Sequence, residues 1–245
     1  MNRSTTNVLI RGELGRFSLQ KISIQKNIKY LKYILSKKEN SLVKQAYDYE
    51  KSKIQSRNTI HSRIIELNQL LTSTEGNEID LIKTNSYKTK KYIDNIFMKE
   101  WQNKFLHSSK SDTYRLFKSE PKLEVYLKYV NDIRYIKTLS KFRLSDHKLM
   151  IEDGRKRRPI LDRNDRLCPN CNKVEDEIHF LLDCTKYKEE RNNMFSKIES
   201  FFPNFCKIPG SKSKFIFLMT QENIDVTKII ATCIYRWLNM REEGN

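Results

Sequence analysis

The sequence predicts a mostly α-helical protein, with a bundle-like N-terminal part, a small module around clustered cysteines and a histidine, and C-terminal helices. Three observations support this fold class. The 245 residues include only 6 glycines and 5 prolines, the residue types that most often interrupt helices. Long stretches carry apolar residues at helical spacing, and few segments show the alternation of strands. Four potential metal ligands lie within 17 consecutive residues in the second half of the chain.

The N-terminal part is predicted to form several amphipathic helices. Apolar residues recur three or four positions apart over residues 21–49, where a break is expected at residues 37–40. The pattern continues over residues 60–71 and stops at the polar residues 73–77. A further helix is expected over residues 87–106. A chain of this length can bury a sizeable core in one or two domains.

The positive charge of the chain is concentrated before residue 161. The sequence has 47 Lys and Arg against 30 Asp and Glu, a formal excess of +17. Residues 161–245 hold 13 of each sign, which leaves 34 basic and 17 acidic residues in 1–160. A polycation of this kind attracts nucleic acid through counterion release, and it also attracts anionic membranes. RNA or DNA is the expected partner, and a merely solvated lysine-rich surface is the alternative.

Residues 121–144 predict one amphipathic helix with a strongly basic face. Pro121 is favoured at the first position of a helix. Tyr129 and Tyr135 are candidates for stacking on bases, although aromatic residues at helical spacing more often belong to a core. The basic side chains are expected to contact phosphates rather than to read base sequence. The expected apolar stripe comprises Leu123, Tyr126, Val130, Ile133 and Leu139 or Phe142. The basic face comprises Lys122, Lys128, Arg134, Lys137, Lys141 and Arg143.

A run of four cations follows, in a segment bracketed by Gly154 and Pro159 and therefore predicted to be a loop. Three roles fit such a run: a phosphate clamp, a nuclear import signal or a solvated linker. Its position just before the cysteine cluster favours the clamp over the import signal. The predicted nucleic-acid-binding set is completed by Lys148 and by the run itself, Arg155, Lys156, Arg157 and Arg158.

The sharpest chemical signal is a set of four ligands at the spacing C-x2-C-x7-H-x4-C, formed by Cys168, Cys171, His179 and Cys184. Three thiols and an imidazole make a complete tetrahedral set for one Zn²⁺. No coordination position stays open to water or substrate, so the zinc is predicted to be structural rather than catalytic. Ordinary buried thiols beside a surface histidine are the alternative. The turn between the first two cysteines contains Pro169, which stiffens it.

The remaining elements surround this zinc module. A short helix is expected over residues 176–184, a charged helix over 185–199, a short apolar element over 214–219 and a closing helix over 225–241. Cys206 and Cys233 are interpreted as small core residues. The predicted domains are a basic helical region at 1–150, the CCHC zinc-binding module with its basic entry loop at 151–200, and a C-terminal helical lid at 201–245.

The sequence also favours an intracellular protein, nuclear or cytoplasmic. No stretch approaches the roughly 18 apolar residues of a spanning helix, and no apolar signal region follows Met1. A thiolate zinc site fits a reducing compartment. A membrane is therefore not an expected partner.

Several segments together resemble the zinc-binding region that follows the polymerase in reverse transcriptases of non-LTR retrotransposons. They are residues 141–149, 151–155, 166–171 and 175–184, with Tyr187 and Arg191. Residues 11–16 and Trp101 are similar to the preceding segment of such elements in animals. The resemblance implies a part that holds template RNA or target DNA, with a reverse transcriptase core as a further partner. It also implies that the four zinc ligands are Cys168, Cys171, His179 and Cys184.

Catalysis is not expected. The sequence has no adjacent Asp-Asp pair, glycine-rich phosphate loop, G-x-S-x-G elbow or H-E-x-x-H pair. Asp146 and His147 are neighbours, which point in different directions on a helix, so a capping or core role is favoured. The leading hypothesis is a non-catalytic nucleic-acid-binding module. A zinc-stabilised scaffold for protein interactions is the alternative, and a nuclease using the scattered carboxylates Asp80, Asp94 and Glu100 is a third hypothesis.

Overall fold

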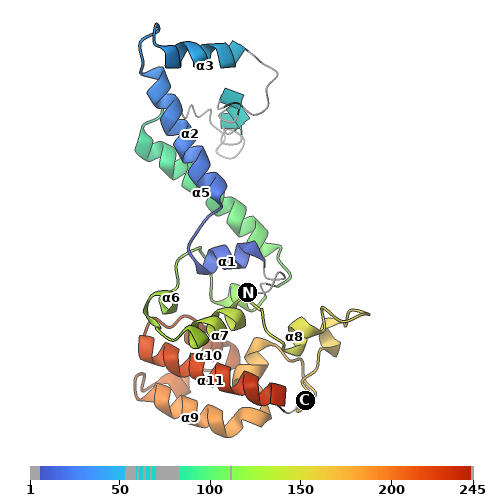
Figure 1. Cartoon of the computed structure of the whole chain (residues 1–245). Coiled ribbons are helices and arrows are strands. Elements are labelled where there is room, and N and C mark those ends of the chain that lie inside the picture. Colours follow the sequence, from blue (N-terminus) through green and yellow to red (C-terminus); the bar gives the residue numbers. More distant parts are fainter. Residues whose placement is uncertain are drawn as a thin grey trace. The chain divides into compact units, whose positions relative to one another are not determined.

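The computed structural model describes residues 6–52, 59, 61–62, 65–66, 68–69, 83–110 and 112–243 (Figure 1). Over these residues the chain forms α-helices and short 3₁₀ or π turns, and its only β features are two isolated bridges. The predicted mostly α-helical fold is confirmed. The chain divides into two compact units. Unit 1 comprises Met1–Arg16 and Lys104–Asn245, and unit 2 comprises Phe17–Asn103.

Unit 2 is built from amphipathic helices around a small apolar core. Its helices are α2 (Leu19–Leu35), α3 (Leu42–Ser52) and most of α5 (Ser86–Leu106). The break predicted at residues 37–40 lies between α2 and α3, and α5 agrees with the helix predicted over 87–106. The helix predicted over residues 60–71 lies largely outside the described residues. The core comprises Ile28, Leu31, Ile34, Tyr47, Ile93 and Phe97.

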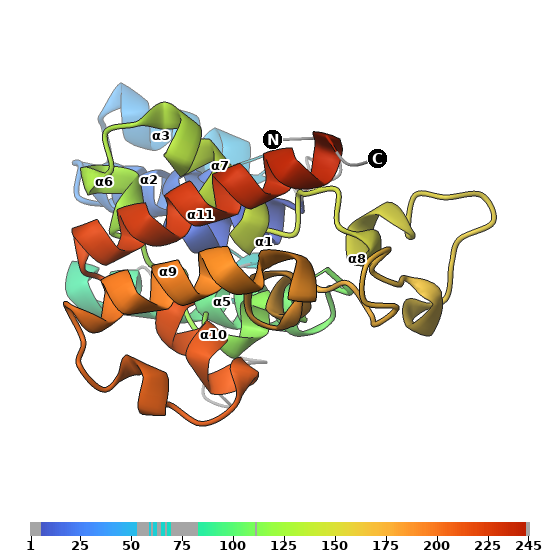
Figure 2. The same ribbon diagram turned by 90° about the horizontal axis from the view of Figure 1, so that it is seen from below.

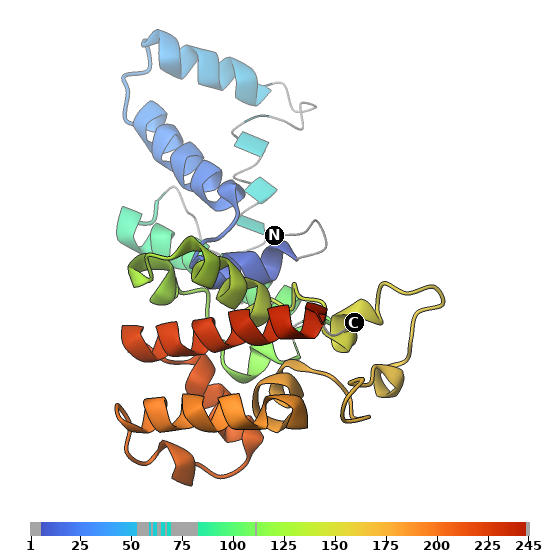
Figure 3. The same ribbon diagram turned by 60° about the horizontal axis from the view of Figure 1, so that its bottom comes forward.

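Unit 1 packs its helices in layers, with α11 between α7 and α9 (Figure 3). The closing helix and the charged helix agree with the predictions, and the apolar element predicted at 214–219 is the end of α10. The elements are α1 (Asn7–Glu13), η1 (Tyr114–Leu116), α6 (Tyr126–Tyr129), α7 (Ile133–Arg143), α8 (Met150–Asp153), η2 (Arg163–Asp165), η3 (His179–Asp183), η4 (Thr185–Tyr187), α9 (Lys188–Glu199), η5 (Phe205–Lys207), α10 (Ser211–Met219) and α11 (Ile224–Glu243).

The single helix predicted over residues 121–144 is wrong, because the segment forms two helices, α6 and α7. Asp132 is the N-cap of α7, and its carboxylate accepts a hydrogen bond from the Arg134 backbone N–H at 2.8 Å. Such caps favour a helix start over helix continuation. The interruption also moves Leu123 and Ile133 out of the expected stripe, since they are 36% and 58% exposed. The stripe residues that are buried are Tyr126, Val130, Leu139 and Phe142.

Helix α1 is fixed to the rest of unit 1 by a buried polar network. The Glu13 carboxylate accepts hydrogen bonds from Tyr126 Oη at 2.6 Å and from Tyr114 Oη at 2.8 Å. It also pairs with Arg143 Nε at 2.5 Å, and Arg143 reaches Glu124 at 2.8 Å. Every charge in this network has a partner, which is the condition for burying one without a large desolvation cost. Two distant stretches of sequence are thereby joined into one unit.

The predicted domain boundaries at residues 150 and 200 do not coincide with the division between the units. One apolar core cluster in unit 1 includes Tyr126 and Trp237 and crosses both boundaries. The interpretation of Cys206 as a core residue is wrong, since its side chain is exposed, whereas Cys233 is partly buried against the core. No helix in the described ranges has the length and apolar character that a membrane crossing requires.

Candidate metal centre and basic surface

The four predicted ligands meet at one place in unit 1. The ligand atoms of Cys168, Cys171, His179 and Cys184 all lie within 4.8 Å of one another. Cys171 is half-buried and the other three are buried. The sequence prediction of a cluster able to hold a metal ion is therefore confirmed.

A tight turn places the first two cysteines. The Cys168 N–H donates to the Lys173 carbonyl at 2.7 Å, and the Asn172 N–H donates to the Cys168 carbonyl at 2.9 Å. Asn172 has a φ of +51°, in the left-handed region that asparagine tolerates better than most residues. An isolated bridge between Leu167 and Val174 closes the loop behind the thiols. Both sulfurs are thus held by backbone geometry.

A π-helical turn within the predicted short helix places the other two ligands. The Cys184 N–H donates to the His179 carbonyl at 2.7 Å, which spans five residues and closes η3. In an α-helix, positions five apart are separated by about 140° around the axis. The wider π turn brings the two residues closer to one face, and such turns are frequent at functional sites. The sequence predicted a short helix at this place but not its π-helical geometry.

The donor atoms fit a tetrahedral metal ion. The sulfur of Cys184 lies 3.9 Å from that of Cys168 and 3.6 Å from that of Cys171. Metal–sulfur bonds of about 2.3 Å in a tetrahedron place sulfurs about 3.8 Å apart. His179 Nε2 is buried and, among the described residues, has no hydrogen-bond partner. An orphaned buried nitrogen is costly unless something binds it, and a metal ion at the cluster would do so.

The local environment acts differently on the two neighbouring thiols. Burial disfavours the Cys171 thiolate, but hydrogen bonds from Thr185 outweigh burial and lower its pKa. The Thr185 N–H donates to this sulfur at 3.3 Å. Burial raises the pKa of Cys184 to about 12. Burial also lowers the pKa of His179, which favours the neutral imidazole that metals bind.

Charged and aromatic side chains attach the cluster to the helices behind it. Arg191 on α9 donates to the carbonyls of Leu181 at 3.0 Å and Cys184 at 2.5 Å. The ring of Tyr187 stacks on Trp237 of α11 with centroids 5.2 Å apart. These contacts give structural roles to Tyr187 and Arg191. In the sequence, these two residues were noted only as part of the resemblance. In addition, Arg241 near the end of α11 pairs with Glu175 at 2.7 and 2.8 Å.

The His147 imidazole lies in a buried network rather than in an acid/base pair with Asp146. The Leu149 N–H donates to Nδ1 at 3.3 Å, so Nε2 carries the proton and donates to Glu177 at 3.0 Å. Ser145 also donates to this carboxylate at 2.7 Å. The favoured core role of His147 agrees with this geometry.

Most of the predicted phosphate-binding side chains are at the surface of unit 1. Arg143 is a clear exception, because it is buried with Glu13 and Glu124 and has no surface to offer a phosphate. The exposed members are Lys122, Lys128, Arg134, Lys137, Lys141, Lys148, Lys156, Arg157 and Arg158.

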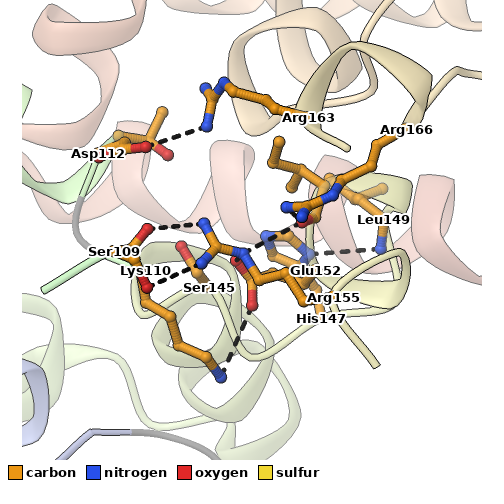
Figure 4. A network of polar contacts seen from close by, with 12 residues as sticks. Ser109, Lys110, Asp112, Ser145, His147, Leu149, Glu152, Arg155, Arg163 and Arg166 are labelled. Atoms are coloured by element: carbon orange, nitrogen blue, oxygen red, sulfur yellow. Dashed lines mark hydrogen bonds and ion pairs between the residues drawn. The ribbon is translucent and has the colours of Figure 1, made fainter. Parts of the chain in front are cut away.

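Arg155 is the second member of the predicted set that is not exposed. It is half-buried and pairs with Glu152 at 3.0 Å. Its guanidinium also donates to the Ser109 side chain at 3.0 Å and carbonyl at 2.6 Å (Figure 4). Lys110 approaches the same Glu152 carboxylate at 3.6 Å. Arg155 therefore anchors the start of the basic loop, whereas the following three cations are exposed.

The remaining predicted residues are the carboxylates of the nuclease hypothesis and the two tyrosines considered for stacking on bases. Asp80 lies outside the described residues, and Asp94 is half-buried and pairs with Lys21 at 2.7 Å. Tyr129 is exposed, whereas Tyr135 is half-buried and packs edge-to-face on Tyr235 at 6.0 Å. The sequence did not single out Tyr235, because it lies on a helix interpreted as a lid.

Comparisons of the chain with models of protein families, with curated proteins and with solved structures find no significant match. The site is therefore interpreted from its own geometry.

Proposed function

We propose that this chain is a non-catalytic nucleic-acid-binding module, stabilised by one structural zinc ion. The observation that carries the proposal is that unit 1 combines a closed set of four metal ligands with a large excess of exposed cations outside that set. A closed ligand set stabilises a fold, and an exposed basic surface binds phosphates. The same combination supports the resemblance to the C-terminal part of non-LTR retrotransposon reverse transcriptases.

Zinc is the proposed metal because of the donor types. Three thiolates and one imidazole suit Zn²⁺ better than the oxygen-seeking ions Mg²⁺ and Ca²⁺. Thiolate bonds of the usual length match the sulfur separations of 3.6 and 3.9 Å. The ion would supply no reaction step here, because the four protein ligands fill a tetrahedral shell. Its contribution is to hold the turn at Cys168 and the π turn at His179 together.

Nucleic acid is the proposed partner because the cations are accessible. Lys128, Lys137 and Lys141 lie exposed on α6 and α7, and Lys156, Arg157 and Arg158 lie exposed in the loop that follows α8. Contacts of this kind release counterions and carry no base specificity by themselves. We therefore expect binding to mixed-sequence RNA or DNA, in the intact system next to a reverse transcriptase core.

The test is a binding titration of the zinc-loaded chain over a series of salt concentrations, with single-stranded and duplex RNA and DNA. The logarithm of the association constant should fall linearly with the logarithm of salt, by about 0.7 to 0.9 for each phosphate contact. Metal analysis of the same preparation should give one zinc per chain. Negligible binding at physiological salt would contradict the proposal.

That negative result would instead favour a zinc-stabilised scaffold for protein interactions. One observation supports this second candidate: unit 2 exposes large apolar side chains, among them Leu19, Leu42 and Tyr87. Amphipathic helices with accessible apolar faces are common recognition surfaces. A scaffold would retain one zinc per chain but would bind neither RNA nor DNA, so the titration separates the two candidates.

A further inference from the structure

Unit 1 contains a basic groove that extends the proposed function to a defined binding site. The groove has a volume of about 390 Å³ and lies between α7, α11 and the segments around residues 147 and 154. Lys141 comes from α7, Lys148 and Lys156 come from the segments on either side of α8, and Tyr235 and Asn239 come from α11. Residues from four parts of the chain thus converge on one hollow.

Three lysines and Arg241 line the groove together with two carboxylates, Asp146 and Asp153, so the lining carries a net positive charge. Among the residues that the structure describes, neither Lys141 nor Lys156 has an ion-pair partner. Asp153 pairs with Arg157 at 3.2 Å. Arg241 pairs with Glu175 at 2.7 Å. The lysine side chains therefore give the groove a positive potential suited to an anionic chain.

The groove also contains an aromatic ring and an amide. Tyr235 is half-buried, and its edge-to-face contact with Tyr135 at 6.0 Å fixes the ring on the surface of α11. An immobilised ring beside a basic groove is the usual platform on which unpaired bases stack. Asn239 lies one turn further along α11 and is exposed. An amide carries both hydrogen-bond donors and an acceptor for a base edge or a sugar hydroxyl.

The size of the groove selects the form of nucleic acid. A volume of 390 Å³ lies in the range of small-molecule sites, roughly 300 to 1,000 Å³. It accommodates about one unpaired base, with the phosphates of adjoining nucleotides along its edges, and it is too small for a double helix. Stacking on Tyr235 also requires an unpaired base.

We propose that this groove binds single-stranded nucleic acid, with Lys141, Lys148 and Lys156 on consecutive phosphates and Tyr235 stacked on one base. This inference rests on the proposed function and sharpens it, because it names one site within the exposed basic surface. The remaining cations, outside the groove and the adjoining loop with Arg157 and Arg158, then attract the strand as a diffuse electrostatic field.

The experiment compares two triple variants with equal change of charge. Lys141, Lys148 and Lys156 are replaced by glutamine in the groove variant. The control variant replaces three exposed lysines of unit 1 outside the groove by glutamine. They are Lys188, Lys207 and Lys212. A short mixed-sequence single strand, RNA in one series and DNA in another, and the matching duplex are the probes. Melting curves and zinc content confirm that each variant is folded.

The groove variant should lose about ten-fold or more in affinity for the single strand, with a salt slope smaller by about two. The control variant should stay within about two-fold of the unaltered chain. Tyr235→Leu should lose about five-fold or more for the single strand and nothing for the duplex, whereas Tyr235→Phe should bind as the unaltered chain does.

Two other outcomes are distinguishable. If the unaltered chain binds no nucleic acid, the proposed function itself fails. If it binds but both triple variants lose affinity equally, or if Tyr235→Leu has no effect, binding is diffuse and the groove proposal is overturned while the proposed function stands.

Discussion

Cys171 is half-buried and Cys206 is exposed, and of these two cysteines of unit 1 only Cys171 lies within the cluster of four ligands. Replacement of Cys171 by serine should abolish zinc binding and unfold the segment around residues 165–190. The free energy of zinc binding at such sites is folding free energy, on the order of 10 kcal/mol. Metal analysis and limited proteolysis of the variant measure both effects.

Cys206→Ser is the matched control. It removes a thiol that lies outside the cluster, so zinc content and protease resistance should not change. A Cys171→Ser protein that still held one zinc per chain would refute the assignment of this ligand. The comparison thus separates a metal ligand from a general sensitivity to losing cysteine.

Gly15 lies where the segment after α1 closely approaches the backbone of Lys122 and Leu123, just before α6. It has a φ of +60°, and a Cβ there would lie 2.9 Å from the Lys122 carbonyl carbon and closer still to the Leu123 nitrogen. Backbone atoms cannot move aside cheaply, so Gly15→Ala should destabilise unit 1 by about 3 kcal/mol or more. Denaturant unfolding measures this loss.

Gly210 separates the two causes of that loss. Its φ is +69°, but a Cβ there would meet nothing within 4 Å. Gly210→Ala should therefore cost only the backbone strain, about 1 kcal/mol. Equal losses for the two variants would show that the close approach at Gly15 contributes nothing.

The basic loop after α8 is an element whose proposed contact with phosphates can be tested by itself. The segment after α8 extends away from the helices of unit 1 (Figure 2), and its Arg157 and Arg158 are exposed. Replacing both by glutamine should leave the melting temperature unchanged and reduce the salt slope of single-strand binding by roughly 1.5. The matched control is the double replacement of Lys207 and Lys212. An unchanged slope in the loop variant would identify the loop as a solvated linker.

Elements were predictable where periodic patterns or steric rules determine them, as in α5 and α11. The ligand set was predictable because metal spacing is local in sequence. Two features were missed, one because of a local cap and the other because of a partner far away in the sequence. Asp132 divides the predicted basic helix through a cap that competes with helical periodicity. Arg143 has the pattern of a surface cation on that helix, but it is buried because it pairs with Glu124 and with Glu13, which lies 130 positions away in the sequence.

The groove was missed for a similar reason. Lys141 and Lys148 were predicted as binding residues from local charge, but Tyr235 lies far along the chain on α11. No sequence period connects the two helices, so their juxtaposition follows from the core that packs α7 on α11. Site residues that converge through tertiary packing carry no local signature.

At the scale of unit 1, the network around Glu13 joins the two stretches of chain and gives stability a defined pH dependence. Burial disfavours the Glu13 carboxylate, but Arg143 and the two tyrosine hydroxyls outweigh burial and lower its pKa below the ordinary 4.5. Its stabilising contribution is therefore present above about pH 4.5 and is lost as pH falls through the lowered pKa. Burial and the Glu13 charge raise the pKa of Tyr126 well above 10. The tyrosine contribution is complete below pH 10 and is lost as pH rises further.

Glu13→Gln should therefore cost about 3 kcal/mol at neutral pH, because Arg143 loses a buried partner. The difference in free energy of unfolding between this variant and the unaltered chain should shrink steadily below pH 4.5, where the carboxylate becomes protonated. Groups with the opposite pH dependence, such as Glu152, whose pKa is raised by burial, are present in both proteins. Their contributions to the free energy of unfolding therefore cancel in the difference. A difference that stayed constant down to acid pH would mean that Glu13 acts by shape alone, and α1 would then be held to unit 1 by packing rather than by charge.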